Sequence, residues 1–432
     1  MPRIRTEPVR GMRDILPPMS VLLRELNSAF SRVAESYGYT HAVLPTIELF
    51  ELFAAKSGPE IERSMYVFKD KAGRVVALRP EFTASVARLY LRHFLPEPKP
   101  VRIYYYGQVF RYEEPQKGRY REFWQAGVEL IGDPSLYADL ELLMMIRDYY
   151  RLIGLSDYRV RLGNVGALRT LMREWGIPEG EQDYIIHLID KKEVDEAVKK
   201  LRGYEAADPD IVYALVSMRT DDPEKVEEMA REAGIKGEAM KYAKNLATLL
   251  RMSREAGISG AYADLGFVRG LAYYTGTIFE VETPHHKSSI AGGGRYDGLI
   301  ELYGGPPTPA TGYSIGVDRT AEALLNAGTA GALIGELPKV MLVASAETIP
   351  FIDRVAGIAR SAGASVDTRF ASKKKIGQLI GLASRKGYRF VIIVGEKEVG
   401  EGKVTIRDLV EREQITVEPE KIPEIISSGG QG

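Results

Sequence analysis

The sequence predicts an α+β domain built on an antiparallel sheet, a helical insertion inside that domain, and a C-terminal α/β domain. Three patterns favour this fold class. Residues 101–111 and 122–131 alternate as two strands of a long hairpin do. Residues 165–256 are rich in charged runs typical of helices. From Lys339 onward, short apolar runs alternate with helical segments, which is typical of a small α/β domain with a mostly parallel sheet.

The first domain begins with an amphipathic helix, which the spacing of its apolar residues predicts over residues 19–37. An extended run follows and contains Pro45, and proline inside a strand indicates a sheet edge or an interface. Residues 74–78 predict a short strand that leads into a helix. Pro80 and Glu81 suit the first turn of this helix, where proline costs no hydrogen bond and an acid meets the positive end of the helix dipole.

The strand predicted over residues 122–131 has two unlike faces, because successive side chains of a strand point to opposite sides. One face is apolar and holds Trp124, Ala126, Val128 and Leu130. The other face holds Phe123, Gln125, Gly127 and Glu129. A strand that packs in a core would not carry an amide and an acid beside a bare glycine. We therefore predict that this second face is the floor of a polar ligand site, where Gly127 leaves room for the ligand.

A helix predicted over residues 136–153 follows, and residues 261–319 return to strands and glycine-rich turns. The last helix of this part is predicted over residues 319–326, and a linker follows it. The predicted domain boundaries are 1–165 with 257–328 for the core, 166–256 for the helical insertion, 329–337 for the linker and 338–432 for the C-terminal domain.

The composition is ordinary for a globular protein: 432 residues, 45% hydrophobic and 27% charged, with a net charge of −1. No apolar run reaches the roughly 18 residues of a membrane helix, and the N-terminus lacks the apolar core of a signal peptide, so we expect a cytoplasmic protein. The absence of cysteine excludes disulfides and thiolate chemistry. The five histidines show no metal-binding spacing, so the sequence predicts no metal site.

Three arginines stand at strand ends or in glycine-rich segments: Arg111, Arg269 and Arg319. Each one alone could be a surface or ion-paired residue. Together they favour a polyanion site, because the planar guanidinium forms paired, charge-assisted bonds with phosphate. The chain has no GxGxxG after a strand, and its segment GEKEVGEGK lacks the GK[ST] of a phosphate-binding loop. A nucleotide would therefore bind on the antiparallel, glycine-rich sheet.

Other residues allow two interpretations each. Glu81 and Thr83 either cap a helix or hold a substrate ammonium group. Tyr273 and Tyr274 are either core aromatics or part of a pocket. The charged segment 112–121 is either a solvated hairpin tip or a loop that contacts a partner.

Several segments together resemble the class II aminoacyl-tRNA synthetases, and within that class the histidyl-tRNA synthetase family. GYTHAVLPTIE is similar to motif 1, the dimer-interface element, FRYEEPQKGRYREFWQAGVE is similar to motif 2, and GYSIGVDR is similar to motif 3. VRGLAYYTG and GGGRYDGL are similar to the two histidine-specific signatures, which are far more specific. The tail resembles the class IIa anticodon-binding domain, so the likeness spans nearly the whole chain.

This resemblance implies the class II catalytic core and an ATP-dependent ligase. The implied reaction attaches L-histidine to tRNA(His) through a histidyl-adenylate and releases AMP and pyrophosphate. ATP is then a substrate, Mg²⁺ accompanies ATP without a dedicated protein site, and the protein is a homodimer that binds no membrane. Because the histidine carboxylate itself attacks the α-phosphate, the reaction needs positioning and cationic stabilisation and no protein nucleophile.

The resemblance also implies roles for residues. Arg111 and Arg269 would hold the α-phosphate and Arg319 the γ-phosphate, with Arg269 in the role that a magnesium ion has in other class II enzymes. The residues implied for histidine binding are Glu81, Phe82, Thr83, Gln125, Glu129, Arg269, Tyr273, Tyr274 and Tyr296. The residues implied for contact with the tRNA acceptor stem are Gln116, Lys117 and Arg119.

Within the histidine set, Glu81, Thr83 and Gln125 would bind the α-amino group, and Glu129 would accept a hydrogen bond from the imidazole ring. A buried acid there would reject amino acids without that donor by about 10⁴-fold. One position departs from the family pattern, because the usual RGLDYY reads RGLAYY here and Ala272 replaces an acid. If that acid supports the pocket, another residue must do so in this chain.

Two alternatives remain open. A regulatory subunit of ATP phosphoribosyltransferase shares the catalytic-core fold and would sense histidine without ligase activity, but such proteins typically lack the C-terminal domain and part of the arginine set. A synthetase-like RNA-binding or signalling protein without activity would lack Arg111, Arg269 or Arg319. The chain has the C-terminal domain and all three arginines, which favours the ligase.

Overall fold

A computed structural model describes residues 4–55, 64–114, 119–270, 273–335, 337–344, 349–372 and 375–428. The chain forms two compact units, Met1–Ile334 and Gly335–Gly432. The predicted boundaries of the core, the insertion and the linker stay predictions. Within the described part of the chain, no helix is long and apolar enough to cross a membrane.

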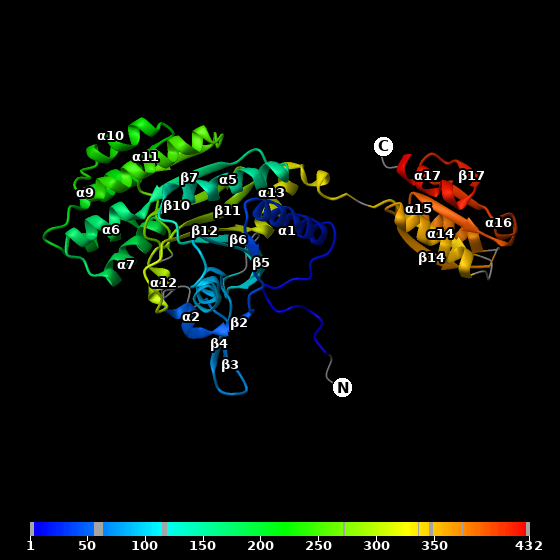
Figure 1. The fold of residues 1–432 in the computed structure, drawn as a ribbon, viewed down its shortest axis with the longest axis horizontal. Helices are drawn as coiled ribbons and strands as arrows, with labels where there is room; N and C mark the ends of the chain where they lie inside the picture. Colours follow the sequence, from blue (N-terminus) through cyan, green and yellow to red (C-terminus); the bar gives the residue numbers. More distant parts are fainter. Residues whose placement is uncertain are drawn as a thin grey trace. The chain divides into compact units, whose positions relative to one another are not determined.

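The first unit is built on a nine-stranded sheet with the order β1-β5-β6-β12-β11-β10-β7-β9-β8 (Figure 1). Among these strands only the β1–β5 and β7–β9 pairs are parallel, so the predicted antiparallel core is confirmed. The strands are β1 (Thr40–His41), β5 (Val101–Phe110), β6 (Glu122–Ile131), β7 (Arg159–Asn164), β8 (Arg219–Thr220), β9 (Ala261–Asp264), β10 (Thr277–Thr283), β11 (His286–Arg295) and β12 (Ala310–Gly316).

One face of this sheet is covered by three helices. They are α1 (Met19–Ser36), α5 (Leu136–Leu152) and α13 (Val317–Ala327). The apolar face of β6 packs against them, because Ala126, Val128 and Leu130 share one buried cluster with residues of all three helices. The opposite, polar face of β6 is thereby turned away from this core, as its alternation predicts.

A smaller sheet with the order β2-β4-β3 precedes the hairpin, and its strands are β2 (Ile47–Leu49), β4 (Val75–Leu78) and β3 (Val67–Lys69). Helices α2 (Phe50–Ala54) and α4 (Thr83–Leu89) and the π-helix η1 (Tyr90–Phe94) complete this region. The expectation that Pro80 lies in the first turn of the helix was wrong, since α4 begins at Thr83. Glu81 lies at the N-terminus of this helix, as expected, and caps it with its side chain.

Six helices lie between β7 and β9: α6 (Val165–Glu174), α7 (Glu179–Asp190), α8 (Val194–Leu201), α9 (Pro209–Ser217), α10 (Pro223–Glu232) and α11 (Ala239–Glu255). Side-chain caps from Asp208 and Asp222, each followed by proline, start α9 and α10. The region also contributes β8, which pairs with β9 at the sheet edge. This helical region is therefore joined to the main sheet by a strand as well as by packing.

After β11 come α12 (Leu299–Leu302) and, beyond α13, the 3₁₀-helix η2 (Ala330–Ala332). The second unit has a five-stranded sheet with the order β14-β13-β15-β16-β17. Its elements are β13 (Lys339–Ala344), α14 (Ile349–Ser361), β14 (Ser365–Phe370), α15 (Ile376–Arg385), β15 (Phe390–Val394), α16 (Glu396–Glu401), β16 (Val404–Asp408), β17 (Gln414–Val417), η4 (Pro419–Lys421) and α17 (Ile422–Ser428).

The α/β character of the second unit agrees with the sequence, but its sheet is not mostly parallel. β13 pairs in parallel with β14 and β15, whereas the β15–β16 and β16–β17 pairs are antiparallel. The short turn between β16 and β17 leaves no length for the crossover that a parallel pair needs.

Candidate active site

The polar face of β6 meets three other segments around the carboxylate of Glu129. Glu129 is buried, with 1% of its surface exposed. Its Oε1 accepts hydrogen bonds from the Thr83 hydroxyl at 2.8 Å and from the Tyr105 hydroxyl at 2.9 Å. Its Oε2 accepts one from the hydroxyl of Tyr296, which follows β11. The start of α4, β5, β6 and the end of β11 thus converge on one acid.

Burial raises the pKa of Glu129 to about 8, although the hydroxyls of Tyr296, Thr83 and Tyr105 stabilise its charged form. The nearby carboxyl group of Glu81 adds to the rise. A carboxylate in such a site is stabilised by any ligand that brings a hydrogen-bond donor or a positive charge to it. The site is therefore suited to a ligand with a polar N–H group.

Two glycines make space for this cluster. A Cβ atom at Gly127 would lie 2.5 Å from the Tyr105 hydroxyl, and one at Gly312 would collide with Oε2 of Glu129. The expectation that Gly127 leaves room for a ligand was therefore wrong, because the Tyr105 side chain occupies that space. Gly127 contributes to the site indirectly. Because it has no side chain, the Tyr105 side chain can lie over β6 and its hydroxyl can donate to Glu129.

Glu81 and Thr83 stand at the start of α4. The Glu81 carboxylate accepts hydrogen bonds from the backbone N–H groups of Thr83 and Ala84, the second at 3.0 Å. Burial raises the pKa of Glu81, and these N–H groups and the charge of Arg111 oppose the rise. Glu81 therefore caps the start of α4, and the Thr83 hydroxyl donates to the buried acid of β6. That the two residues hold a substrate ammonium group stays a prediction.

Aromatic rings surround the same region. Phe82 stacks on Tyr105 with ring centroids 4.4 Å apart, and Tyr273 meets Tyr296 edge-on at 5.9 Å. Tyr274 lies 4.9 Å from Tyr273, but it is buried in an apolar cluster with residues of α6 and α7. Tyr274 is buried and Tyr273 is partly exposed beside Tyr296. Phe82 and Tyr296 belong to the same apolar cluster as Tyr274, so the pocket role of Tyr274 stays a prediction.

The three predicted arginines come from distant parts of the chain. Arg111 follows β5, Arg269 follows β9, and Arg319 lies in the first turn of α13. Burial lowers the pKa of Arg319, and the positive charges of Arg111, Arg119 and Arg269 lower it further. An anion relieves such repulsion between like charges, so this group of arginines is suited to a polyphosphate.

Each of these arginines is held by the protein itself. Nε of Arg111 donates to a backbone carbonyl oxygen at 2.9 Å, and Nη1 of Arg319 donates to another at 3.0 Å. Nη1 of Arg269 donates to Glu280 of β10 at 2.9 Å. Its guanidinium crosses Gly292, where any Cβ atom would collide with it. Burial alone would lower the pKa of Arg269, but the negative groups around it, Glu280 first and then Tyr274, Tyr273 and Asp190, together raise it.

The structure gives fewer side-chain contacts for the other predicted site residues. Gln125 is half-buried and lies on β6 two residues after Phe123, on the strand face of Glu129. Arg119 lies 3.9 Å from the carboxylate of Glu113. Gln116 and Lys117 lie outside the described residues.

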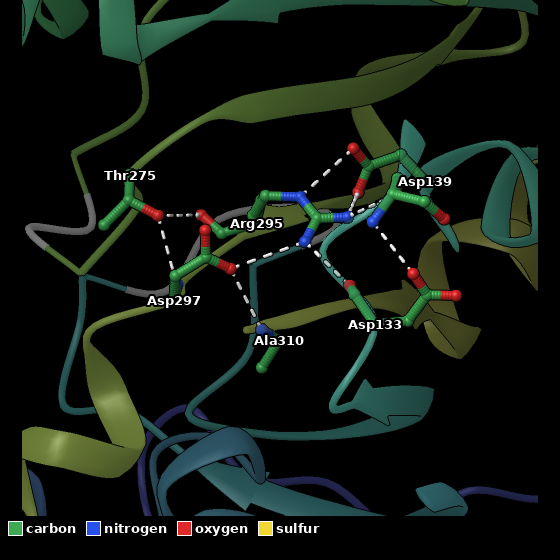
Figure 2. Close-up of polar contacts among 7 residues, drawn as sticks. Asp133, Asp139, Thr275, Arg295, Asp297 and Ala310 are labelled. Carbon is green, nitrogen blue, oxygen red and sulfur yellow. Dashed lines mark hydrogen bonds and ion pairs between the residues drawn. The ribbon is translucent and has the colours of Figure 1, made fainter. Parts of the chain in front are cut away.

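A buried ion pair that the sequence did not predict lies beside Tyr296 (Figure 2). Arg295, the last residue of β11, donates to both carboxylate oxygens of Asp139 of α5, at 2.9 and 3.2 Å. The two side chains are 9% and 1% exposed. Arg295 also donates to the backbone carbonyl oxygens of Asp133 and Ser135, at 3.0 and 2.9 Å. The end of β11 is thereby fixed to the start of α5.

Asp297 extends this network to the segment that carries Tyr273 (Figure 2). Its carboxylate accepts hydrogen bonds from the N–H of Ala310 at 3.0 Å and from Arg295 at 3.4 Å. Its own N–H donates to the Thr275 hydroxyl at 3.1 Å. No sequence pattern reveals the ion pair at the centre, because its partners are 156 residues apart. The only local signal was the glycine-rich run that ends at Arg295.

Comparison with known proteins identifies sequence relatives over the whole chain. Residues 11–320 match the family model for histidyl-tRNA synthetase, and residues 339–428 match the model for an anticodon binding domain. The histidine–tRNA ligase of Saccharolobus solfataricus is 40% identical over 428 residues, which is 98% of this chain and 99% of that protein. That of Metallosphaera sedula is 41% identical over 427 residues, 98% of each chain.

Several solved structures have a similar fold. The histidyl-tRNA synthetase of a Nostoc species matches with a TM-score of 0.79 at 26% identity, over 99% of this chain and 100% of that one. The apo enzyme of S. aureus matches with a TM-score of 0.72 at 27% identity, over 98% and 100%. A Bacillus halodurans protein is described as an ATP phosphoribosyltransferase regulatory subunit/histidyl-tRNA synthetase. It matches with a TM-score of 0.76 at 25% identity, over 91% of this chain and 99% of that one.

Proposed function

The chain belongs to the histidyl-tRNA synthetase family, and we propose that the site around Glu129 performs the first step of histidine–tRNA ligation. Identity of about 40% to histidine–tRNA ligases over the full length makes the chain an aminoacyl-tRNA ligase. In the first step the carboxylate of L-histidine attacks the α-phosphate of ATP and pyrophosphate leaves. In the second step histidine passes to the 3′ end of tRNA(His) and AMP leaves. We place both steps in the cytoplasm.

The observation that carries this proposal is the buried carboxylate of Glu129 beside the group of arginines. Glu129 accepts a hydrogen bond from an imidazole N–H of histidine, and Tyr273 and Tyr296 flank the ring. An amino acid without such a donor leaves the buried acid unpaired, which disfavours its binding. Glu81, Thr83 and Gln125 hold the α-amino group, with Phe82 beneath them.

The phosphates of ATP lie against the arginines. Arg111 and Arg269 contact the α-phosphate, and Arg319 contacts the γ-phosphate. Bound phosphate relieves the repulsion that lowers the pKa of Arg319. The rate then comes from alignment of carboxylate and phosphate and from charge stabilisation, and no protein nucleophile takes part.

Mg²⁺ enters this scheme with ATP. Among the described residues there is no group of three or more His, Asp or Glu side chains that could hold a metal ion. We propose that the magnesium ion is held largely by the phosphates, which are its usual partners together with one or two carboxylates. When bound, the ion neutralises phosphate charge.

ATP–pyrophosphate exchange with each amino acid in turn tests the proposal. We expect exchange that depends on histidine and falls by about 10⁴-fold with other amino acids. Arg269→Ala should abolish exchange and leave the oligomeric state unchanged. No exchange with histidine, or equal exchange with another amino acid, would refute the proposed step, and near-normal exchange by the variant would refute the phosphate site.

The alternative of a histidine-sensing regulatory subunit is less well supported. The relatives named as ligases match this chain from end to end, including the anticodon-binding part at residues 339–428. A regulatory subunit would bind histidine but would not catalyse ATP–pyrophosphate exchange. The exchange assay therefore also separates these two functions.

The second unit and the segment after Arg111 are proposed to bind tRNA(His). The match of residues 339–428 to an anticodon binding domain supports the first assignment. For the second, Arg119 lies near Arg319 and pairs loosely with Glu113, at 3.9 Å, so its guanidinium can exchange this partner for a phosphate of the acceptor stem. Gln116 and Lys117 belong to the same proposed contact.

The three-stranded sheet β2-β4-β3 supports a homodimer. It carries apolar side chains that are 42–50% exposed, and these are Ile47, Leu49, Val67, Phe68 and Val75. An exposed apolar patch of this kind marks an interaction surface. We propose that a second copy of the chain covers it, since the preceding segment with Pro45 is similar to the dimer-interface motif.

Sedimentation equilibrium tests the dimer. Phe68→Asp should raise the dimer dissociation constant by about tenfold or more, because it places a charge in an apolar interface. Leu152→Asp, at a residue of α5 that is 44% exposed, is the matched control and should leave the dimer intact. A monomeric wild-type protein, or equal effects of the two variants, would contradict this interface.

A further inference from the structure

The helical region between β7 and β9 contacts the segment that carries Tyr273 and Tyr274 through a partly buried arginine. Nε of Arg169, on α6, donates to the backbone carbonyl oxygen of Tyr274 at 3.1 Å. Nη2 of the same guanidinium donates to Asp183 of α7 at 2.7 Å. Only 14% of the Arg169 side chain is exposed. Two helices thus hold a guanidinium that in turn holds the chain at Tyr274.

A second contact comes from the end of α7. The carboxylate of Asp190 lies so close to Gly270 that a Cβ atom there would be 2.8 Å from its Oδ2. Burial raises the pKa of Asp190, and the charge of Arg269 and the N–H of Gly270 oppose the rise. Asp190 is therefore a counter-charge for Arg269 and a hydrogen-bond partner of the next residue.

Packing joins the same parts. Residues of α6 and α7, including Leu168 and Ile189, share one apolar cluster with Phe267, Val268 and Tyr274. The chain on both sides of Arg269 and Tyr273 is therefore packed against the insertion. A rigid support of this kind reduces the number of positions that the two side chains can adopt.

We propose that Arg169 and Asp190 are positioning residues for histidine activation, because they hold the chain at Tyr274 and at Gly270 and so place Tyr273 and Arg269 in the site. The inference rests on the proposed function of that site. It also assigns a role to the insertion. The signature of this chain has Ala272, outside the described residues, where the family has an acid, and Asp190 brings a carboxylate to the same segment from another part of the sequence.

Steady-state exchange kinetics of the full-length protein test this proposal. Arg169→Ala should raise KM for histidine about tenfold and leave KM for ATP within about twofold, because it frees the chain at Tyr274. Asp190→Ala should lower kcat about tenfold, because Arg269 loses a counter-charge. Calorimetric titration of histidine into Arg169→Ala without ATP should show the same loss of affinity as KM.

Matched controls lie one helical turn or one helix away. Arg173→Ala removes an exposed arginine of α6 whose Nη2 donates to the Thr170 hydroxyl of its own helix at 3.0 Å. Asp195→Ala removes an acid of α8 that accepts a hydrogen bond from the Tyr213 hydroxyl. Both should keep wild-type constants. Asp183→Ala should raise KM for histidine and add nothing to Arg169→Ala, since it acts through that arginine.

Several outcomes would overturn the proposal. If Arg169→Ala and Asp190→Ala both have wild-type kcat and KM values, the positioning role is refuted and the proposed function of the site is unaffected. A loss of activity that only follows a lower melting temperature, with unchanged KM for histidine, would show a structural role alone. A wild-type protein without histidine-dependent exchange would instead refute the proposed function, and the two failures are thereby distinguished.

Discussion

At the scale of single residues, the raised pKa of Glu129 depends on its burial and on its neighbours, and the sequence predicts only some of these neighbours. Its place on the polar face of β6 follows from the alternation of residues 122–131. The hydrogen bond from the Tyr105 hydroxyl was not predicted, because a tyrosine in a mostly apolar strand is typical of a core residue. Gly127 was singled out for the wrong reason, since the space that it leaves is filled by that tyrosine. Close approaches between strands are not visible in one-dimensional patterns.

Glu129→Gln should change stability in a pH-dependent way. The pKa of Glu129 rises from its usual 4.5 to about 8 in the folded protein. Ionising this carboxyl is therefore harder in the folded than in the unfolded chain, and the wild type loses stability as pH rises from about 4.5 to about 8. Glutamine does not ionise, so the melting temperature of the variant minus that of the wild type should increase with pH.

Thermal unfolding of both proteins without ligand, at pH 5 and at pH 8.5, measures this difference. The reference variant is Glu301→Gln, which makes the same substitution at an exposed residue of α12. A constant difference for Glu129→Gln would mean that the acid is already ionised at the lower pH.

At the scale of elements, the sequence predicts what depends on local periodicity. The bounds of α1, β5, β6 and α5 follow from apolar spacing to within a residue or two, and the antiparallel hairpin follows from alternation. The turn between β16 and β17 was missed, and the second sheet is more antiparallel than expected as a result. The pairing of Arg295 with Asp139 depends on strand order and helix packing, which no single segment encodes.

Arg295→Met should lower the free energy of unfolding of the first unit by about 3–5 kcal/mol, because it leaves the buried Asp139 without its counter-charge. Urea unfolding followed by circular dichroism measures the change. Arg251→Met is the matched control, since the pair of Arg251 with Glu224 is 46% and 74% exposed, and its loss should cost about 0–1 kcal/mol. Equal effects of the two substitutions would show that the buried network adds nothing to stability.

At the scale of the whole molecule, the chain joins a unit that holds the proposed ligation site to a unit with its own apolar core. Residues such as Val340, Phe390 and Ile406 form that second core, and they share no cluster with the first unit among the described residues. The sequence pattern changes at Lys339, and the second unit begins at Gly335, because each part must bury its own apolar residues.

Deletion of residues 336–432 should leave ATP–pyrophosphate exchange within about twofold of the intact chain and reduce aminoacylation by about a hundredfold, because tRNA loses one of two linked binding sites. Exchange and aminoacylation assays on the same preparation, with circular dichroism to confirm folding, measure the two effects. Unchanged aminoacylation would argue against the anticodon-binding role.

The order of the nine-stranded sheet has a consequence for how the protein behaves at high concentration. Its two edge strands, β1 and β8, are two residues long, whereas the strands between them reach ten. An edge strand exposes unpaired N–H and C=O groups that can recruit a strand of another chain, and a two-residue edge offers too few of them to do so. The two edge strands of the large sheet are therefore poor templates for aggregation, whereas the small sheet carries the exposed apolar side chains that we propose a second copy of the chain covers.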